Sequence, residues 1–167
     1  EVKMKILLVF WFFLVFLAST LHAITFHCEF RNLSWGGFEN LYSCYSPWMS
    51  ELSNRNLTNV TGIHQTGKTN LDVKSVYILD NTDLTLVPQR IENFFPNFIG
   101  LAFQNTSIAE LSGDELNSFV NLEAFQIWVN LLERTPGNLF QLTPKLRYID
   151  FDRNQIENVG EQLFNPL

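Results

Sequence analysis

The stretch Leu122-Glu123-Ala124-Phe125-Gln126-Ile127-Trp128-Val129-Asn130-Leu131-Leu132 carries the pattern that decides the fold. Counted from Leu122, apolar residues occupy positions 1, 4, 6 and 11, and an asparagine occupies position 9. In an extended strand, positions 4 and 6 point to one side while positions 3, 5 and 7 point to the other. The stretch therefore predicts a short strand that buries Phe125 and Ile127, followed by an inward turn at Asn130.

This pattern recurs through the second half of the chain at a spacing of 24 or 25 residues, and the repeats begin at Val73, Phe98, Leu122 and Leu146. One repeat cannot bury its own apolar side, so successive repeats must stack and share a core. The spacing LxxLxLxxNxL is that of leucine-rich repeats. It predicts a leucine-rich-repeat solenoid of the α/β type, with mainly short parallel strands and an irregular or 3-10 helical convex side.

Position 9 of each repeat has a structural explanation. An asparagine amide there can donate to and accept from backbone groups of neighbouring repeats that would otherwise be buried without partners. The residues at this position are Asn81, Thr106, Asn130 and Asn154. The shorter side chain of Thr106 is expected to satisfy fewer groups and to weaken its repeat slightly.

The N-terminal segment 1–23 has the features of a secretory signal peptide. Lys3 and Lys5 precede thirteen unbroken apolar residues, and cleavage is expected after Ala23. The alternative is a membrane anchor, but a spanning helix needs about 20 apolar residues. The segment predicts a secreted, extracellular protein with no membrane span in this chain.

Both ends of the sequence suggest that it differs in extent from the natural protein. Met4 is the first methionine, so the residues before it are expected to lie upstream of the true start. At Leu167 the fourth repeat stops without a cap, although solenoids cover their last apolar layer. We therefore expect an incomplete C-terminal end.

The two cysteines, Cys28 and Cys44, lie between the signal segment and the first repeat. An even pair in a secreted chain predicts a disulfide, which here closes an N-terminal cap. In the chain-entropy model, closing a loop of about 15 residues stabilises by roughly 3 kcal/mol. A metal or catalytic thiol pair is the alternative, but only His27 is close to the cysteines in sequence.

Residues 24–72 do not follow the repeat, so we expect three parts: 1–23, the cap 24–72, and the four repeats 73–167. Five aromatic residues crowd around the cysteine pair, namely Trp35, Phe38, Tyr42, Tyr45 and Trp48. We expect them to cover the open apolar end of the first repeat, although an aromatic cage for a ligand is the alternative. Residues 59–76 predict a short hairpin or an extended entry into the repeats.

Four Asn-X-Ser/Thr triplets are candidate N-glycosylation sites behind a signal peptide, at Asn32, Asn56, Asn59 and Asn105. Glycans on Asn56 and Asn59 would compete for space. A glycan on Asn105 would shield part of the sheet face that the second repeat contributes.

No catalytic motif stands out, and we predict a protein that is not an enzyme and needs no cofactor. Outside the signal segment the histidines are His27 and His64, and neither lies in a recognisable motif. Gly62-x4-Gly67-Lys68-Thr69 matches the spacing of a phosphate-binding loop, but no apolar helix follows it. The formal net charge of −6, without a basic stripe, predicts no nucleic-acid partner.

Asp150 and Asp152 fall on alternate positions of one predicted strand. They could hold calcium or form an acid/base pair. The alternative is a solvated acidic rim that Arg147 and Arg153 neutralise, and we predict no metal site.

The outward positions of the strands define the surface that a partner meets on the predicted concave face. Large aromatics and arginine are enriched among residues that dominate interface energetics. The predicted binding residues are Tyr77, Gln104, Gln126, Trp128, Tyr148, Asp150, Asp152 and Arg153. Trp128 is either a binding anchor or a side chain that packs on its neighbours.

Four motifs outside the repeat consensus are shared with one family: Cys28-x15-Cys44 with Trp35 and Tyr42, Thr61-Gly62-Ile63-His64-x2-Gly67-Lys68-x3-Asp72-Val73, Phe94-Phe95-Pro96-Asn97-Phe98, and Leu139-Phe140-x3-Pro144-x-Leu146. With them the chain resembles the secreted leucine-rich-repeat proteins of insects, particularly flies and midges. The resemblance implies an extracellular interaction protein, in a family with some members linked to innate immunity and with no catalytic residue to carry over.

The sequence thus predicts a secreted module that binds a protein or a cell- or pathogen-surface ligand through the concave face of the solenoid. The alternatives are a component of the extracellular matrix or of cell adhesion, and an N-terminal fragment of a membrane-anchored receptor. The oligomeric state is left open.

Overall fold

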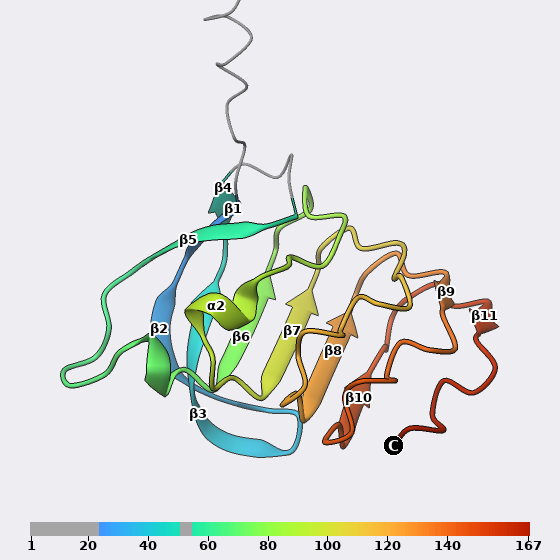
Figure 1. The fold of residues 1–167 in the computed structure, drawn as a ribbon. Coiled ribbons are helices and arrows are strands. Elements are labelled where there is room, and N and C mark those ends of the chain that lie inside the picture. The colour runs from blue at the N-terminus through green and yellow to red at the C-terminus, as the bar shows by residue number, and fades with distance from the viewer. Residues whose placement is uncertain (1–23, 51–54) are drawn as a thin grey trace, which may run out of the picture.

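A computed structural model describes residues 24–50 and 55–167, so the predicted signal peptide lies outside the described residues. The main feature is a six-stranded mixed sheet with the strand order β10-β8-β7-β6-β3-β2 (Figure 1). Its strands are β2 (Glu29–Trp35), β3 (Phe38–Ser46), β6 (Ser75–Leu79), β7 (Gly100–Gln104), β8 (Ala124–Trp128) and β10 (Tyr148–Asp150). Strands β2 and β3 form an antiparallel hairpin, and the remaining neighbours pair in parallel.

Two smaller sheets and two short helices complete the described fold. A three-stranded sheet has β1 (Ile24–His27) between β4 (Met49–Ser50) and β5 (Leu57–Thr61), and a two-stranded sheet joins β9 (Arg134–Thr135) to β11 (Asn158–Val159). The helices are the 3-10 turn η1 (Asn70–Asp72) and α2 (Ile91–Phe94). Among the described residues, no helix is long and apolar enough to span a membrane.

The strand positions predicted from the repeat are confirmed. Val76, Leu101, Phe125 and Ile149 pair in one row across β6, β7, β8 and β10. Together with the row two residues further on, they point into the core, and the six completely buried side chains of these rows are Val76, Ile78, Leu101, Phe103, Phe125 and Ile127.

The predicted leucine-rich-repeat solenoid, with its convex and concave sides, is wrong as a description of the architecture. The sheet is mixed, because the hairpin of β2 and β3 joins the parallel strands at the β6 side. Helical structure in the described chain is limited to η1 and the four residues of α2. The repeat pattern determines the spacing of the parallel strands, but it contains no information on the non-repeating residues 24–72.

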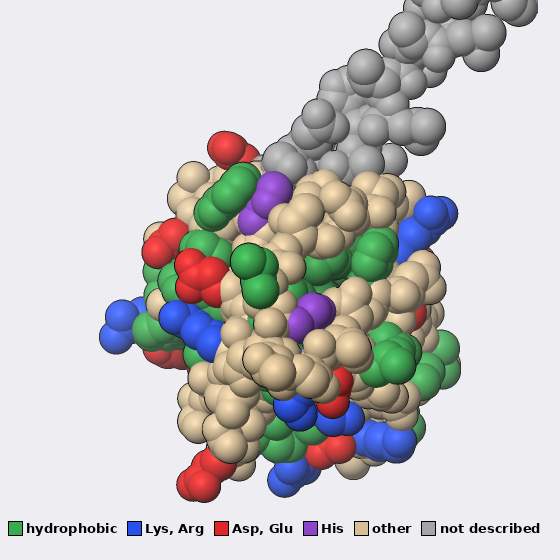
Figure 2. Space-filling model, turned by 90° about the vertical axis from the view of Figure 1, so that its left-hand side faces the viewer, with side chains coloured by type: hydrophobic (Ala, Val, Ile, Leu, Met, Phe, Trp, Pro, Cys, Tyr) green, Lys and Arg blue, Asp and Glu red, His purple; other side chains and the backbone are tan. Residues whose placement is uncertain are grey.

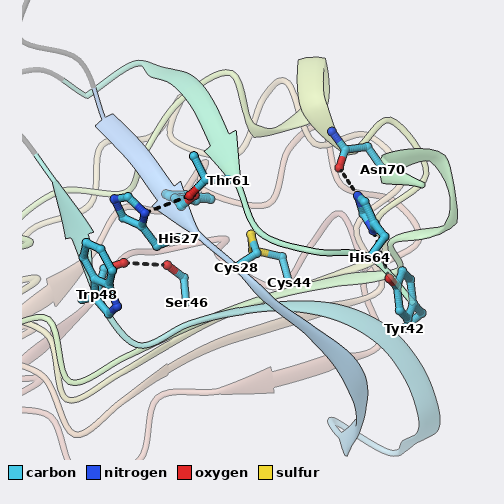
Figure 3. Close-up of a disulfide and its surroundings, with 10 residues drawn as sticks. His27, Cys28, Tyr42, Cys44, Ser46, Trp48, Thr61, His64 and Asn70 are labelled. Atoms are coloured by element: carbon cyan, nitrogen blue, oxygen red, sulfur yellow. Dashed lines mark hydrogen bonds between the residues drawn. A yellow bond between two sulfur atoms is a disulfide. The ribbon is translucent and has the colours of Figure 1, made fainter. Parts of the chain in front are cut away.

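The predicted disulfide between Cys28 and Cys44 is confirmed (Figure 3). It ties the residue after β1 to the middle of β3, with a Cα–Cα distance of 4.9 Å. Cys44 is completely buried and pairs in register with Val76 of β6. The bridge therefore connects the three-stranded sheet to the edge of the parallel strands. Of the two alternatives predicted for residues 59–76, the structure shows the extended entry and not the hairpin: β5 ends at Thr61 and a loop leads to η1.

At position 8 of each repeat, a residue with left-handed backbone conformation follows the strand, directly after β6, β7 and β8 and three residues after the end of β10. The φ angles are 54° for Asp80, 50° for Asn105, 54° for Val129 and 54° for Arg153. This conformation turns the chain inward, so that position 9 enters the core side.

The predicted role of the position 9 asparagines is confirmed for Asn130 and Asn154. The Asn130 amide nitrogen donates to the carbonyls of Phe103 (3.1 Å) and Trp128 (2.9 Å), and its oxygen accepts from the Ile108 N–H (3.2 Å). Asn154 donates to Ile127 O at 2.7 Å and accepts from Leu132 N at 3.1 Å.

Thr106 behaves as its shorter side chain suggests. Its hydroxyl donates to the Asn130 oxygen and reaches no backbone group among the hydrogen bonds of the described residues.

Replacing Asn130 by alanine should strongly destabilise the protein. The substitution leaves the buried Phe103 carbonyl and Ile108 N–H without their partner, and each orphaned group costs about 1–3 kcal/mol. We expect a loss of roughly 2–4 kcal/mol in the free energy of unfolding, measured by urea denaturation. Asn121→Ala is the control, because the Asn121 side chain is exposed and its Oδ1 accepts a hydrogen bond from Lys145 Nζ at 2.7 Å. A similar loss in both variants would contradict the role of Asn130.

Candidate functional site

The candidate site lies on the outer face of the six-stranded sheet, which is the face turned away from the core. Alternate residues form rows across the strands on this face. The first row is Ser43, Ser75, Gly100, Ala124 and Tyr148, and the second is Tyr45, Tyr77, Ala102, Gln126 and Asp150. Leu79, Gln104 and Trp128 follow in a third row.

The tip of the β2–β3 hairpin covers the middle of the first row, from Ser75 to Ala124, and ends beside the half-buried Tyr148 ring. In Figure 1 the hairpin bends under the lower ends of β6, β7 and β8. Trp35 packs so closely on Gly100 that a Cβ there would lie 2.7 Å from the indole Cζ2, and its Nε1 donates to Ser75 Oγ at 3.2 Å. At the turn, a Cβ on Gly36 would lie 3.1 Å from Ala124 Cβ and 3.2 Å from the Tyr148 ring.

This cover corrects two predictions. The face predicted to be an open concave surface is closed over its first row, where Ser75, Gly100 and Ala124 are completely or almost completely buried. The aromatics of residues 24–72 do not all cover the core: Trp35 lies on the outer face, and the Phe38 ring lies 4.1 Å from the Arg147 guanidinium carbon.

The remaining cap aromatics lie on different sides of the sheet. Tyr42 is buried and its ring is 6.1 Å from that of Phe30, whereas Tyr45 belongs to the outer face. Trp48 is 57% exposed and stacks on His27 at 3.7 Å.

The hairpin leaves an uncovered area that we call the outer-face strip. Its members are Tyr45, Tyr77, Gln104, Trp128, Tyr148, Asp150 and Asp152, and all are half-buried or exposed. Of the other predicted binding residues, Gln126 lies in the same row as Tyr77 and Asp150 but is only 7% exposed, and Arg153 follows Asp152 in the segment after β10. The structure therefore gathers the predicted side chains in one area.

Tyr77 lies at the centre of an aromatic group. Its ring stacks on Tyr45 at 6.0 Å and meets the edge of Trp35 at 5.8 Å, while its hydroxyl donates to Gln104 Oε1 at 2.5 Å. Burial, and then the neighbouring Tyr45, Asp150 and Tyr148, raise the pKa of the Tyr77 hydroxyl above its ordinary value of 10.0.

Tyr148 and Asp150 form a second pair. The Tyr148 hydroxyl donates to Asp150 Oδ2 at 3.3 Å, and the Asp152 N–H donates to Asp150 Oδ1 at 2.9 Å. Burial and the Asp150 carboxylate raise the pKa of the Tyr148 hydroxyl. The carboxylate is therefore oriented by its own strand.

Trp128 interacts with Asp152, which follows the neighbouring strand β10. Its Nε1 donates to Asp152 Oδ2 at 3.1 Å, and the Arg153 guanidinium carbon lies 5.3 Å from the indole ring. Arg153 also pairs with Asp152 at 3.5 Å, as predicted. Arg147 does not neutralise either aspartate, because it pairs with Glu123 at 3.1 Å.

Sequence reasoning missed the hairpin residues that border this area. Tyr45 lies in the predicted cap and Arg31 in no predicted site, yet the Arg31 guanidinium carbon lies 3.6 Å from the centre of the Tyr45 ring. A signal was present: three of the four residues at position 3 of the repeats are small, Ser75, Gly100 and Ala124. Such a row marks a close approach by another segment.

A hollow of about 410 Å³ away from the outer-face strip is a competing candidate site among the described residues, and it is lined by Phe30, Val60, Thr61, Gly62, His64, Lys68, Thr69 and Asn70. His64 stacks on Phe30 at 3.6 Å. Its Nδ1 lies 2.9 Å from the Tyr42 hydroxyl and its Nε2 lies 2.9 Å from Asn70 Oδ1 (Figure 3). His64 therefore links the loop to the hairpin through Nδ1 and to η1 through Nε2.

In the segment with the spacing of a phosphate-binding loop, the polar groups bind the carboxylate of Asp72 from the same chain. The Thr69 N–H donates to Asp72 Oδ2 at 2.9 Å, and Lys68 Nζ lies 3.5 Å from Asp72 Oδ1. The backbone hydrogen bond from Thr69 is the main cause that lowers the pKa of Asp72. The groups that would meet a phosphate are thus bonded to Asp72, which caps η1.

On the side shown in Figure 2, several lysine and arginine side chains lie close together near the lower edge, with acidic side chains among them. Across residues 24–50 and 55–167, no three His, Cys, Asp or Glu side chains lie together in an arrangement that could hold a metal ion.

The four glycosylation candidates differ in accessibility. Asn32, Asn59 and Asn105 are exposed, whereas Asn56 is half-buried and forms a parallel bridge with Gln89. The Asn105 amide donates to Asp80 Oδ1 at 2.6 Å.

No protein-family model and no curated protein matches this chain. The resemblance to the insect family therefore stays a prediction from the motifs.

The contact between Trp35 and Gly100 can be tested with a double-mutant cycle. Gly100→Val should destabilise by roughly 1–3 kcal/mol, because the new side chain forces the indole away from the sheet. In a Trp35→Ala background the same substitution should cost less by about 1 kcal/mol or more in urea unfolding. Equal costs in the two backgrounds would show that Trp35 does not lie on Gly100.

The raised pKa of Tyr77 predicts a loss of stability at alkaline pH. The folded state favours the neutral phenol, so this contribution is complete below pH 10.0, the ordinary pKa, and is lost as pH rises through the higher folded value. Tyr77→Phe keeps the ring and should reduce the alkaline decline in the free energy of unfolding. Ultraviolet titration should show one late-ionising tyrosine fewer, and an unchanged titration curve would count against this assignment.

Proposed function

We propose that the chain is a secreted, glycosylated and non-catalytic binding module, and that it holds a protein partner on the outer-face strip. The observation that carries this proposal is the grouping of Tyr77, Trp128 and Tyr148 on one uncovered area, each with its polar atom bonded to a neighbouring side chain. Aromatic rings anchored in this way offer rigid contact area at low entropic cost, which is typical of residues that dominate interfaces.

The hairpin supports this assignment because it limits where a partner can reach the sheet. Trp35 and Gly36 occupy the first row over Ser75, Gly100 and Ala124, so contact with the outer face is confined to Tyr148 and to the rows that begin at Tyr45. The Cys28–Cys44 disulfide supports an oxidising compartment, since such bridges persist mainly in secreted proteins. The exposed Asn32, Asn59 and Asn105 are the glycosylation sites that we favour.

Trp128→Ala tests the proposal. The protein is immobilised, its partners are captured from extracellular fluid, and the affinity of the purified partner is then measured for both forms. A Trp anchor on the interface should cost at least about 2 kcal/mol of binding free energy when it is truncated.

Leu131→Ala is the matched control, because Leu131 is 45% exposed and lies outside the outer-face strip. It should leave affinity unchanged. Binding that survives Trp128→Ala at full strength would place the interface elsewhere and refute the proposal.

A further inference from the structure

Arginine binds to this protein's own surface in one recurring arrangement. The Arg31 guanidinium carbon lies 3.6 Å from the centre of the Tyr45 ring, and its Nη1 lies 3.7 Å from Glu29. A guanidinium is planar and weakly hydrated, so it can stack on a ring while it pairs with a carboxylate. Arg31 does both at the β2 side of the sheet.

The same arrangement occurs twice more around the outer face. Arg147 lies over the Phe38 ring at 4.1 Å and pairs with Glu123 at 3.1 Å. Arg153 lies 5.3 Å from the Trp128 ring and pairs with Asp152 at 3.5 Å. These three groups come from different segments, so the arrangement is a general feature of this surface.

Tyr148 and Asp150 have the first two components of such a group, an aromatic ring and a carboxylate joined by a hydrogen bond of 3.3 Å. Within the described part of the chain, no lysine or arginine pairs with Asp150 or stacks on Tyr148. The carboxylate is half-buried, and its two hydrogen bonds use about half of the lone-pair sites that a carboxylate offers.

We propose that Tyr148 and Asp150 bind the guanidinium group of an arginine side chain supplied by a protein partner. This inference rests on the proposed function and names the chemistry that the outer-face strip recognises. The pair lies on β10, next to β8 in the six-stranded sheet, and its side chains face the outer side of that sheet.

Charge favours the same partner. The chain has a formal net charge of −6, which attracts a basic segment during encounter. Asp152 is already paired with Arg153, so Asp150 is the carboxylate of the strip that can accept a cation without breaking an internal ion pair.

The test uses two capped pentapeptides as probes, Gly-Gly-Arg-Gly-Gly and its citrulline analogue, which has the same shape without the charge. Titration of the isotope-labelled full chain, followed by NMR, should shift the amide signals of Tyr148, Asp150 and Asp152 with the arginine probe only. Asp150→Asn should weaken the arginine probe about tenfold, as expected for the loss of a charge-assisted hydrogen bond.

Asp83→Asn is the matched control, since Asp83 is an exposed aspartate in the turn after β6 and away from the strip. It should leave the affinity for the arginine probe unchanged, and thermal unfolding of both variants checks that they fold. Equal binding of the citrulline probe, or full binding by the Asp150→Asn variant, would overturn the inference. If the arginine probe fails while Trp128→Ala still abolishes partner capture, the strip binds a different chemistry and the proposed function stands.

Discussion

The in-register pairing of the parallel strands is the constraint on which the rest of the structure depends. Once Cys44, Val76, Leu101, Phe125 and the partly buried Ile149 share one row that faces the core, alternate residues of these strands must face outward in rows of their own. The rows bring together side chains that are 24 or more residues apart in sequence. Both the cover formed by the hairpin and the outer-face strip are consequences of this arrangement.

The hairpin divides the outward rows into two kinds of surface. Where Trp35 and Gly36 lie on the sheet, the strands carry Ser75, Gly100 and Ala124, because a larger side chain would collide with the hairpin. Beyond the hairpin, the rows carry tyrosine, tryptophan and aspartate. Packing therefore determines the residues of the first row, whereas the outer-face strip is free to carry residues suited to binding.

The parts of the structure that were predictable are those encoded within one repeat. The spacing of Phe125 and Ile127 predicts that both are buried. The amide of Asn130 predicts that this residue bonds to backbone groups at the inward turn. The hairpin was not predictable in this way, because Trp35 and Gly100 are far apart in sequence and no periodicity links them. Its existence was hinted at by Gly36-Gly37 between two strands and by the small residues at position 3. Arg147 pairs with Glu123 and not with the aspartates, because its position beside β10 and its contact with Phe38 direct it there. Neither contact can be read from the sequence, since the partners are far apart along the chain.

The left-handed residue at the end of β8 has a consequence for cooperativity. Asp80 and Asn105 adopt this conformation readily, but Val129 is β-branched and carries a conformational cost of about 1–2 kcal/mol at a φ of 54°. Its N–H donates to the Asp152 carbonyl at 3.2 Å, and the next N–H donates to Arg153. The backbone that follows Trp128 is thus held in place by the end of β10 and not by its own preference. The ordered position of the Trp128 side chain therefore depends on the neighbouring strand. Local opening of β10 would release the Trp128 indole as well.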